Sequence, residues 1–308
     1  MKVLVLGAGL VGGPIALDLS SEDRFEITVA DLDEAALGRL EGRKGIKTVR
    51  TDLAASGEVA ALASGHDMVI SAVPGFMGFS TLREVIEAGR DVIDIAFFPE
   101  DPFELDKLAR ERGVTAVVDC GVAPGMSNLL AAHAAGLMDE ATDIVIYVGG
   151  LPVRRRWPWE YRAVFSPIDV IEEYTRPARY VENGRIVTRP ALSDPELVDF
   201  PETGTLEAFN SDGLRTLAST LHVPNMKEKT LRYPGHIEKI AVLRETGFFG
   251  REEIEIGGAL IRPLDFTARI LFPVWKMEED DADITVMRIT VEGMAGGRPV
   301  RRRWDLFD

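Results

Sequence analysis

The sequence of 308 residues contains one cysteine, Cys120, and no apolar run that approaches the ~20 residues of a membrane-spanning helix. A single cysteine excludes an internal disulfide framework and suits a reducing cytosol, so we expect a cytoplasmic location. The N-terminal stretch "MKVLVLGAG" is too short for the apolar region of a signal peptide and is typical of a strand. We therefore expect no membrane partner.

Basic residues are also scarce, because 35 Lys and Arg stand against 50 Asp and Glu and give a net charge of −15. A surface this acidic disfavours nucleic acid and anionic membranes as partners. The densest acidic segment, residues 278–283, is expected to be a solvated loop. With four histidines, one cysteine and scattered acids, the sequence predicts no metal site.

The first 122 residues alternate short apolar runs with amphipathic segments. Strand-like runs include "KVLVLGA", "FEITVAD", "DMVISAVP" and "DVIDIA", and helical candidates such as "STLREVIEAG" separate them. Near-continuous apolar strands that alternate with helices are typical of a parallel sheet covered on both faces. We therefore predict an α/β fold in which residues 1–122 form a Rossmann-fold domain with a parallel sheet.

A different pattern follows in residues 123–308. Segments such as "DIVIYVGGLP" and "ADITVMRITVEG" are longer and alternate in polarity, and Asn183-Gly184 lies between two β-like runs, which is a strong hairpin signal. The segment "TLEAFNSDGLRTLASTL" is expected to be helical in its second half, with Ser211 or Asp212 as its cap. This half predicts a second, α+β domain with a mixed or antiparallel sheet.

The clearest motif is "GAGLVG", which follows the first strand and opens a helix. Gly7 allows the tight turn, Gly9 lets a pyrophosphate approach the backbone, and Gly12 lets the helix pack on the strand. The helix N-terminus offers free N–H groups to the phosphates. We predict that these glycines, with Leu10 and Val11 of the same loop, bind a dinucleotide.

Asp31 ends the second predicted strand, where a carboxylate can accept hydrogen bonds from both hydroxyl groups of the adenosine ribose. The same carboxylate repels a 2′-phosphate. Leu32 and Asp33 follow, so no arginine is placed to bind that phosphate. The predicted cofactor is therefore NAD rather than NADP. The alternative is a Rossmann-like domain without a nucleotide.

The ends of later strands are further candidates, because ligands of open α/β sheets bind beyond the carboxyl ends of the strands. The ends of the third and fourth strands are predicted to flank the adenine and to lie along the nicotinamide ribose, respectively. The residues at these two ends are Asp52, Leu53, Val73 and Pro74. Residues 94–98 and 120–128 are predicted to surround the nicotinamide, and Asp94 is a candidate proton acceptor.

The sequence resembles the saccharopine dehydrogenase superfamily over essentially its whole length, and within it most closely the lysine 6-dehydrogenases. The motifs that carry the resemblance are, in chain order, "GAGLVG", "CGVAPGMSNLLA", "EEYTRPARYVENG", "LEAFNSDGLRTL" and "KTLRYPGHIEKI". The resemblance implies NAD-linked oxidation of an amine on an amino-acid substrate, and a second domain whose sheet helps to form a homodimer. Relatives usually continue beyond a stretch like "RWDLFD" with a segment that packs back on the nucleotide domain, and we expect this chain to lack it.

An amino-acid substrate carries a carboxylate and an ammonium group. Arg215 and Arg232 are candidates for the carboxylate, since a guanidinium can bind it through two hydrogen bonds. Glu160 is a candidate to hold the ammonium group, and Tyr161 to form a wall of the pocket. For each arginine the alternative is a surface ion pair, and for the aromatic residues it is packing.

His236 is the candidate general base. Hydride transfer from a carbon bonded to nitrogen requires a neutral amine, whereas the lysine side chain has a pKa near ~10.4. His236 follows Pro234-Gly235, a break that can aim a side chain out of a strand end, and histidine titrates near neutral pH. The alternative is a structural histidine that is hydrogen-bonded within the protein.

Together these residues predict an NAD-dependent dehydrogenase that deaminates L-lysine oxidatively at its ε-carbon, giving an aldehyde that can cyclise. The first alternative is a saccharopine-type or carboxyspermidine-type imine reductase. Such an enzyme needs a second carboxylate site, which Arg215 and Arg232 together could supply. The second alternative is a non-catalytic NAD-binding protein, which would leave the histidine and arginines of the second half unexplained.

Overall fold

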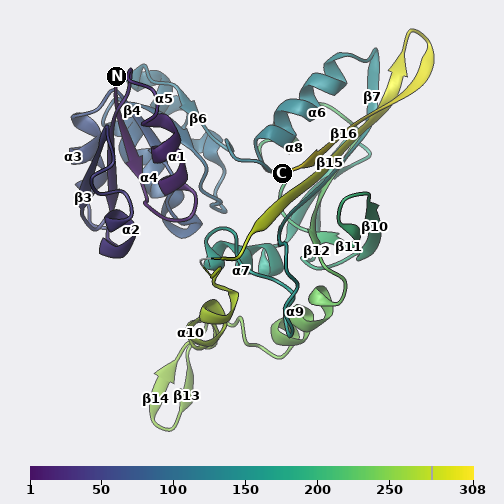
Figure 1. Ribbon diagram of the computed structural model, residues 1–308. Coiled ribbons are helices and arrows are strands. Elements are labelled where there is room, and N and C mark those ends of the chain that lie inside the picture. The colour runs from purple at the N-terminus through teal and green to yellow at the C-terminus, as the bar shows by residue number, and fades with distance from the viewer. Residues whose placement is uncertain (279) are drawn as a thin grey trace. The chain divides into compact units, whose positions relative to one another are not determined.

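The computed structural model describes residues 1–278 and 280–308 and divides into two compact units, Met1–Gly121 and Val122–Asp308. Each unit has its own sheet and its own hydrophobic core (Figure 1). In the part of the chain that the structure describes, every helix is too short or too polar to cross a bilayer.

The first unit is built on a six-stranded parallel sheet with the order β3-β2-β1-β4-β5-β6. This order is typical of dinucleotide-binding folds. Successive strands are added on one side of β1 as far as β3 and then on its other side from β4 onward, although all strands stay parallel. The strands are β1 (Lys2–Leu6), β2 (Glu26–Asp31), β3 (Ile46–Arg50), β4 (Met68–Ser71), β5 (Asp91–Asp94) and β6 (Ala116–Val117). The helices are α1 (Gly12–Leu19), α2 (Glu34–Gly38), α3 (Glu58–Ser64), α4 (Gly75–Glu87), the 3₁₀ helix η1 (Pro102–Leu105) and α5 (Asp106–Arg112).

Helices cover both faces of this sheet because its central strand is apolar on both faces. In β1, Val3 and Val5 belong to the core cluster that includes residues of α1 and α2. Leu4 and Leu6 belong to the cluster that includes residues of α3 and α4. A strand buried on both sides is the pattern expected of a parallel sheet, and the predicted Rossmann fold is confirmed.

The second unit contains a mixed eight-stranded sheet with the order β10-β11-β12-β7-β15-β16, to which β8 and β9 are added beside β12. Strands β7 and β12 pair in parallel, and the other pairs described for this sheet are antiparallel. The strands are β7 (Glu140–Pro152), β8 (Ala178–Glu182), β9 (Arg185–Arg189), β10 (Glu196–Phe200), β11 (Gly204–Asn210), β12 (Asn225–Arg232), β15 (Asp283–Ala295) and β16 (Arg298–Phe307). A separate hairpin consists of β13 (Ile254–Ile256) and β14 (Ala259–Ile261). The helices are α6 (Met126–Gly136), α7 (Pro167–Thr175), α8 (Leu217–Thr220), α9 (His236–Glu245) and α10 (Pro263–Trp275).

Two local predictions for this unit had different outcomes. The hairpin at Asn183-Gly184 is confirmed: β8 and β9 pair across it, and both turn residues have positive φ. The prediction that Ser211 or Asp212 caps the following helix was wrong. The helix, α8, begins only at Leu217, and both cap candidates lie in a buried loop where Glu228 and Arg179 bind them. Buried partners thus outweighed the local capping preference.

Three helices, α7, α9 and α10, pack around a second core rich in aromatic residues. Trp275 is fully buried at the end of α10, and its ring lies 5.4 Å from that of Tyr161 and 6.3 Å from that of Tyr174. All three side chains belong to one cluster, so this core connects the segment after β7 with the three helices.

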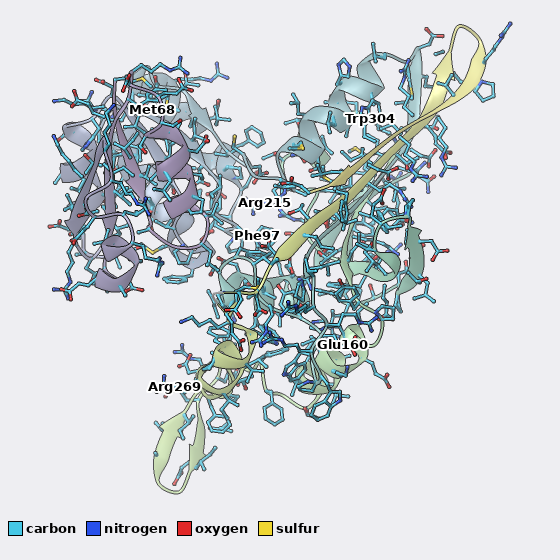
Figure 2. The ribbon with its side chains drawn as sticks, in the orientation of Figure 1. Met68, Phe97, Glu160, Arg215, Arg269 and Trp304 are labelled. Atoms are coloured by element: carbon cyan, nitrogen blue, oxygen red, sulfur yellow. The ribbon has the colours of Figure 1, made fainter. Side chains whose placement is uncertain are left out.

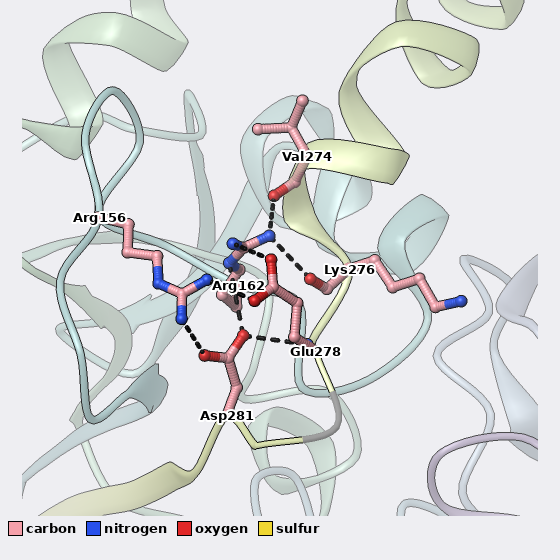
Figure 3. Close-up of polar contacts among 6 residues, drawn as sticks. All are labelled: Arg156, Arg162, Val274, Lys276, Glu278 and Asp281. Carbon is pink, nitrogen blue, oxygen red and sulfur yellow. Dashed lines mark hydrogen bonds and ion pairs between the residues drawn. The ribbon is translucent and has the colours of Figure 1, made fainter.

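The predicted solvated loop at 278–283 was wrong for Asp281, whereas Glu279 lies outside the described residues. The side chain of Asp281 is only 5% exposed and approaches Arg156 at 3.0 Å and Arg162 at 3.8 Å (Figure 3). Arg162 also donates to the carbonyl oxygen of Val274 in the last turn of α10 and to that of Lys276 just past its end. A hydrogen bond from the Glu278 backbone and the two arginines lower the pKa of Asp281.

The aromatic core predicts a large difference between two tryptophans of the second unit. Trp275→Ala removes a fully buried side chain and should lower the free energy of unfolding by about 3–5 kcal/mol. Trp157→Ala is the matched control, because Trp157 is 84% exposed and its loss should change stability by no more than about 0.5 kcal/mol. Urea unfolding followed by circular dichroism measures both. Equal destabilisation by the two changes would contradict the packing described above.

Candidate functional site

Two glycines at the turn from β1 into α1 are required by contacts within the protein. Gly7 has φ +101°, which glycine adopts readily, and a Cβ atom there would lie 2.6 Å from the carbonyl oxygen of Ala72. A Cβ atom on Gly12 would lie 2.0 Å from the carbonyl oxygen of Gly7. Neither position can hold a side chain unless the loop moves.

The outer part of the same loop is open. A Cβ atom on Gly9 would meet no described protein atom within 4 Å, and Leu10 and Val11 are exposed. Val11 is the N-cap residue of α1, and its side chain makes no capping hydrogen bond. In the first turn the N–H of Gly13 donates to the carbonyl oxygen of Gly9 at 3.1 Å and Pro14 has no N–H, so the N–H of Gly12 is the group that this helix start offers to an anion. These residues fit the pyrophosphate of a dinucleotide.

Asp31 connects the end of β2 with this loop. The backbone N–H of Ala8 donates to its Oδ2 at 2.6 Å, and that of Asp33 donates to its Oδ1 at 2.8 Å. Each carboxylate oxygen has a second lone pair, so both can still accept from a ribose hydroxyl group. The carboxylate is therefore held in place and keeps acceptor capacity.

The other residues predicted to contact the nucleotide differ in exposure. Asp52 is exposed and accepts a hydrogen bond from the N–H of Ala54 at 2.9 Å, whereas Leu53 packs against the core of the first unit. Val73 is buried, and Pro74 is the N-cap residue of α4. Leu53 and Val73 thus anchor the loops after β3 and β4 to the core of the first unit. Their contacts with a nucleotide stay predictions.

Asp94 ends β5 and is completely buried. Its Oδ2 accepts a hydrogen bond from the N–H of Ala96 at 3.1 Å, and its carbonyl oxygen accepts one from the N–H of Cys120 at 3.1 Å. It lies at the carboxyl end of the parallel sheet, as predicted from the sequence. Its role as a proton acceptor stays a prediction.

In the second unit, Arg232 ends β12 as a buried cation with a partner for each of its three nitrogens. Nε donates to the hydroxyl of Tyr174 at 3.0 Å, one terminal nitrogen to the carboxylate of Glu173 at 2.5 Å, and the other to the carbonyl of Leu231 at 2.9 Å. The guanidinium also lies 4.5 Å from the centre of the Tyr161 ring. Three of its five N–H groups are used in this way, and the residue is 1% exposed, so a substrate carboxylate could reach Arg232 only if the surrounding core opened.

His236 does not point outward from a strand end, as the Pro-Gly break suggested. It is the first residue of α9, and it is 1% exposed. Its Nε2 lies 2.9 Å from the hydroxyl of Tyr174, and its Nδ1 lies 2.9 Å from the carbonyl oxygen of Trp159. Burial, followed by the charge of Arg232, lowers its pKa to about 3. His236 is thus a neutral imidazole, and its role as a base stays a prediction.

The two residues after Trp159, Glu160 and Tyr161, have different environments. Glu160 has φ +52° and accepts a hydrogen bond from Arg155 at 2.6 Å on a partly exposed turn (Figure 2). Tyr161 is 3% exposed and lies in the aromatic core, with its ring 5.1 Å from that of His236. The structure thus brings Tyr161, Arg232 and His236 together and leaves Glu160 outside their cluster.

Arg215 lies in a different place, on the buried loop 211–215 that follows β11 (Figure 2). It has φ +46°, which is uncommon for a residue with a side chain and often marks a functional position. Asp212 fixes the loop on one side by accepting three hydrogen bonds from Arg179, at 3.1, 2.9 and 2.8 Å. We name this segment the Arg215 loop.

Glu228 of β12 fixes the Arg215 loop from beneath. Its Oε2 accepts from the hydroxyl of Ser211 at 2.8 Å and from the N–H of Gly213 at 3.1 Å. The contact is so close that a Cβ atom on Gly213 would lie 2.2 Å from the Glu228 carboxyl carbon. Burial raises the pKa of Glu228 to about 8, so this carboxyl is largely protonated at neutral pH.

Two arginines near Arg215 were not singled out from the sequence. Burial lowers the pKa of Arg176, and the positive charges of Arg215 and Arg179 lower it further, whereas Glu172 and Asp212 raise it. Three guanidinium groups therefore lie within electrostatic reach of one another. The run "TRPAR" was the available signal, because it places Arg176 at the end of α7 and Arg179 in the strand β8 that follows.

No group of three or more His, Cys, Asp or Glu that could hold a metal ion occurs among the residues the structure describes. Together these two units define the class of proteins in which an N-terminal dinucleotide-binding fold precedes an α+β domain.

Family models identify the family within this class. The model described as saccharopine dehydrogenase C-terminal domain matches residues 121–308, and that described as saccharopine dehydrogenase NADP binding domain matches residues 3–117. The chain therefore belongs to the saccharopine dehydrogenase family, and the predicted resemblance at that level is confirmed.

Individual relatives are distant. The alpha-aminoadipic semialdehyde synthase of Rattus norvegicus is 27% identical over 270 residues, which cover 82% of this chain but 29% of the relative. The saccharopine dehydrogenase [NADP(+), L-glutamate-forming] of Pyricularia oryzae is 26% identical, with 94% of this chain and 67% of the relative covered. The carboxyaminopropylagmatine dehydrogenase of Synechocystis is 24% identical, with 96% and 79% covered. The chain thus spans about 29% of the length of its mammalian relatives.

A solved structure supports the same fold. The apo saccharopine dehydrogenase (L-Glu forming) from Saccharomyces cerevisiae matches with a TM-score of 0.77 at 19% identity, over 100% of this chain and 85% of that chain. The homospermidine synthase of Legionella pneumophila matches with a TM-score of 0.61 at 13% identity, over 99% and 77%. At these identities the likeness concerns the fold alone.

The raised pKa of Glu228 predicts a pH-dependent stability. As pH rises from about 4.5 to about 8, the carboxyl ionises in the unfolded chain but stays protonated in the folded one, so the free energy of unfolding should fall. At ~1.4 kcal/mol per pKa unit, the loss amounts to a few kcal/mol. Glu228→Gln keeps the acceptor oxygen and cannot ionise, so the variant should lose this slope and exceed the wild type in stability above about pH 8.

Urea unfolding over this pH range measures the effect. Glu207→Gln is the matched control, because Glu207 lies on the neighbouring strand and accepts from the N–H of Gly235, but is only partly buried. The control should keep the wild-type slope. An unchanged slope in Glu228→Gln would mean that Glu228 is already ionised in the folded protein.

Proposed function

We propose that this protein is a pyridine-nucleotide-dependent oxidoreductase that acts on a carbon–nitrogen bond of an amino-acid substrate. The observation that carries the proposal is the glycine loop of the first unit, which is closed at Gly7 and Gly12, open at Gly9 and held by Asp31. A bound nucleotide of this kind supplies the hydride acceptor. The match of both units to saccharopine dehydrogenase domains supports the substrate class.

We further propose that the nucleotide is NAD, although the matching family model and several relatives carry NADP in their names. Asp31 presents a fixed negative charge where a 2′-phosphate would lie, and the exposed Leu32 after it offers no cation. The basic residue opposite Asp31 on the neighbouring strand is Arg50, the last residue of β3. Its guanidinium lies 3.1 Å from Glu34 and is thereby partly neutralised.

The Arg215 loop is the proposed site for a substrate carboxylate. Arg215 and Arg179 both act on the pKa of the largely buried Arg176, so the three guanidinium groups lie close to one another. Guanidinium groups gathered in this way attract an anion such as a carboxylate. Arg232, in contrast, is engaged at all three nitrogens, so we assign it a role in holding the core.

The proposed substrate is a secondary amine that joins two amino-acid parts, as in saccharopine. The relatives named saccharopine dehydrogenase and carboxyaminopropylagmatine dehydrogenase support this choice. Removal of a hydride and a proton would convert the amine into an imine, and addition of water would then release an aldehyde and a primary amine. The second candidate is L-lysine, which the motifs around Arg215 and His236 support; the same steps would release ammonia.

His236 has a defined part in this proposal. It holds the hydroxyl of Tyr174, which in turn accepts from Arg232, so it stabilises the core beneath the end of β12. To act as a base it would have to release Tyr174 or the carbonyl of Trp159.

A cytoplasmic location and a homodimer complete the proposal.

The substrate class is tested by incubating the protein with saccharopine or L-lysine and NAD, and by measuring reduced nicotinamide, L-glutamate and ammonia. Saccharopine should yield reduced nicotinamide and L-glutamate, whereas L-lysine would yield ammonia instead. Arg215→Met should raise KM for the active substrate by about 30- to 1000-fold, since charge-assisted bonds worth about 2–4 kcal/mol are lost. The nucleotide affinity should not change.

Arg185→Met is the matched control, because Arg185 is an exposed arginine of β9. It should leave KM unchanged. An Arg215 variant with normal KM would remove the Arg215 loop from carboxylate binding. Absence of turnover with every amine tested, despite nucleotide binding, would favour the non-catalytic alternative.

The cofactor preference is tested by fluorescence titration of reduced NAD and reduced NADP. NAD should bind at least about tenfold more tightly, which corresponds to ~1.4 kcal/mol for one repelled phosphate group. The double change Asp31→Ser with Leu32→Arg should reduce or reverse the preference. Tighter binding of NADP by the wild type would overturn the argument from Asp31 and point to Arg50.

A further inference from the structure

Phe76 lies in the first turn of α4 and is the most exposed phenylalanine among the described residues, with an exposure of 75%. A phenyl ring that is this exposed gains free energy whenever a ligand or another surface covers it. Single exposed apolar residues are common on proteins, so it is the position of Phe76 that identifies its partner.

The segment that leads into α4 lies against the glycine loop. The N–H of Ala72 donates to the carbonyl oxygen of Leu6 at 2.9 Å, which continues the pairing of β4 with β1. A Cβ atom on Gly7 would lie 2.6 Å from the carbonyl oxygen of Ala72, and one on Gly12 would lie 3.2 Å from the Ala72 Cβ atom. Phe76 therefore follows closely after a residue that is packed against both closed glycines of the loop.

The start of α4 is fixed by the core of the first unit. A Cβ atom on Gly78 would lie 2.7 Å from side-chain atoms of Ala96 and of Phe98, in the segment after β5. The ring of Phe79 packs against that of Phe98, with 5.8 Å between the ring centres. Phe76 thus stands on a turn whose other side is tightly packed, so its side chain is presented from a rigid backbone.

The strand order identifies which half of a dinucleotide reaches Phe76. In the order β3-β2-β1-β4-β5-β6, the glycine loop follows β1 and fits the pyrophosphate in the middle of the dinucleotide. Asp31, which fits the adenosine ribose, ends β2 on one side of β1. Phe76 follows β4 on the other side. A dinucleotide that crosses the loop therefore extends its adenosine toward Asp31 and its nicotinamide toward Phe76.

Nicotinamide has the shape and polarity that suit an aromatic side chain. Its ring is flat, and only one face has to stay open for the exchange of hydride with a substrate. Aromatic rings attract one another in offset and edge-to-face arrangements, and ligand sites are lined mainly by apolar and aromatic side chains. Leu10, which is 53% exposed on the glycine loop, adds a second apolar side chain at the same edge of the sheet.

We propose that Phe76 binds the nicotinamide ring of the cofactor and, with Leu10, covers the part of the dinucleotide that exchanges hydride. This inference rests on the proposed function, because it takes a pyridine nucleotide as the ligand of the glycine loop. It adds a recognition residue beyond the strand end at Val73 and Pro74. It holds for NAD and NADP alike, since both carry this ring.

Isothermal titration calorimetry with reduced NAD and with ADP-ribose tests the inference, since ADP-ribose has every part of the dinucleotide except the nicotinamide ring. Phe76→Ala should weaken binding of reduced NAD about 10- to 100-fold, which corresponds to ~1.4–2.7 kcal/mol, and should leave the affinity for ADP-ribose unchanged. Phe76→Tyr keeps an aromatic ring and should bind both ligands like the wild type. Melting followed by circular dichroism should show that each variant is as stable as the wild type, because Phe76 is exposed.

Two further variants are the controls. Leu32→Ala changes an exposed residue directly after Asp31, on the adenosine side, and should affect reduced NAD and ADP-ribose by the same factor. Leu17→Ala changes an exposed residue near the far end of α1 and should affect neither ligand. The inference is overturned if Phe76→Ala binds reduced NAD normally or loses affinity for both ligands equally. A wild type that binds neither ligand would contradict the nucleotide site itself, and with it the role of Phe76.

Discussion

The second unit depends on the pairing of one buried cation. The guanidinium of Arg232 is almost completely removed from water, and a charge in that position is tolerated only when its donors are satisfied. Its partners come from three places in the chain: the end of β12, the C-terminal part of α7 and the ring of Tyr161. Through Tyr174 the same network reaches His236 at the start of α9. One guanidinium thus fixes a strand, two helices and the segment after β7 relative to one another.

The same strand supports the Arg215 loop. Glu228, Thr230 and Arg232 alternate along β12 and therefore share a face, and all three are buried. Glu228 holds the loop, Thr230 contacts the hydroxyl of Ser211, and Arg232 holds the aromatic core. A row of buried polar residues on one strand is costly unless every member is bonded, and a strand of this kind specifies one arrangement of the segments above it. The position of the proposed carboxylate site and the packing of the core are therefore consequences of one strand.

The sequence was most informative where a single local rule governs the structure. Alternating apolar runs and a glycine motif sufficed for the Rossmann fold, because in β1 successive residues contact opposite layers of helices. It was least informative for buried charges. Glu228 stands between Lys227 and Lys229 in a charged run typical of a surface, and only the tertiary structure shows that it faces inward. The Pro-Gly break before His236 was identified, but its direction was not, because Gly235 in a left-handed conformation starts a helix as readily as it ends a strand. The same limit applies to Arg176 and Arg179, which come together only when a helix and a strand are placed.

The uncapped start of α1 connects the lifetime of the first unit with metabolism. Val11 has no side-chain acceptor for the N–H of Gly12, so this group gains a partner when an anion binds at the start of α1. A ligand that binds only the folded state raises its stability with concentration, by about 2.7 kcal/mol when it is present at a hundred times its dissociation constant. The fraction of unfolded chains open to proteolysis should then follow the cellular nucleotide pool. Binding at the start of α1 would make this protein persist in cells rich in its cofactor and turn over faster in cells that are depleted of it.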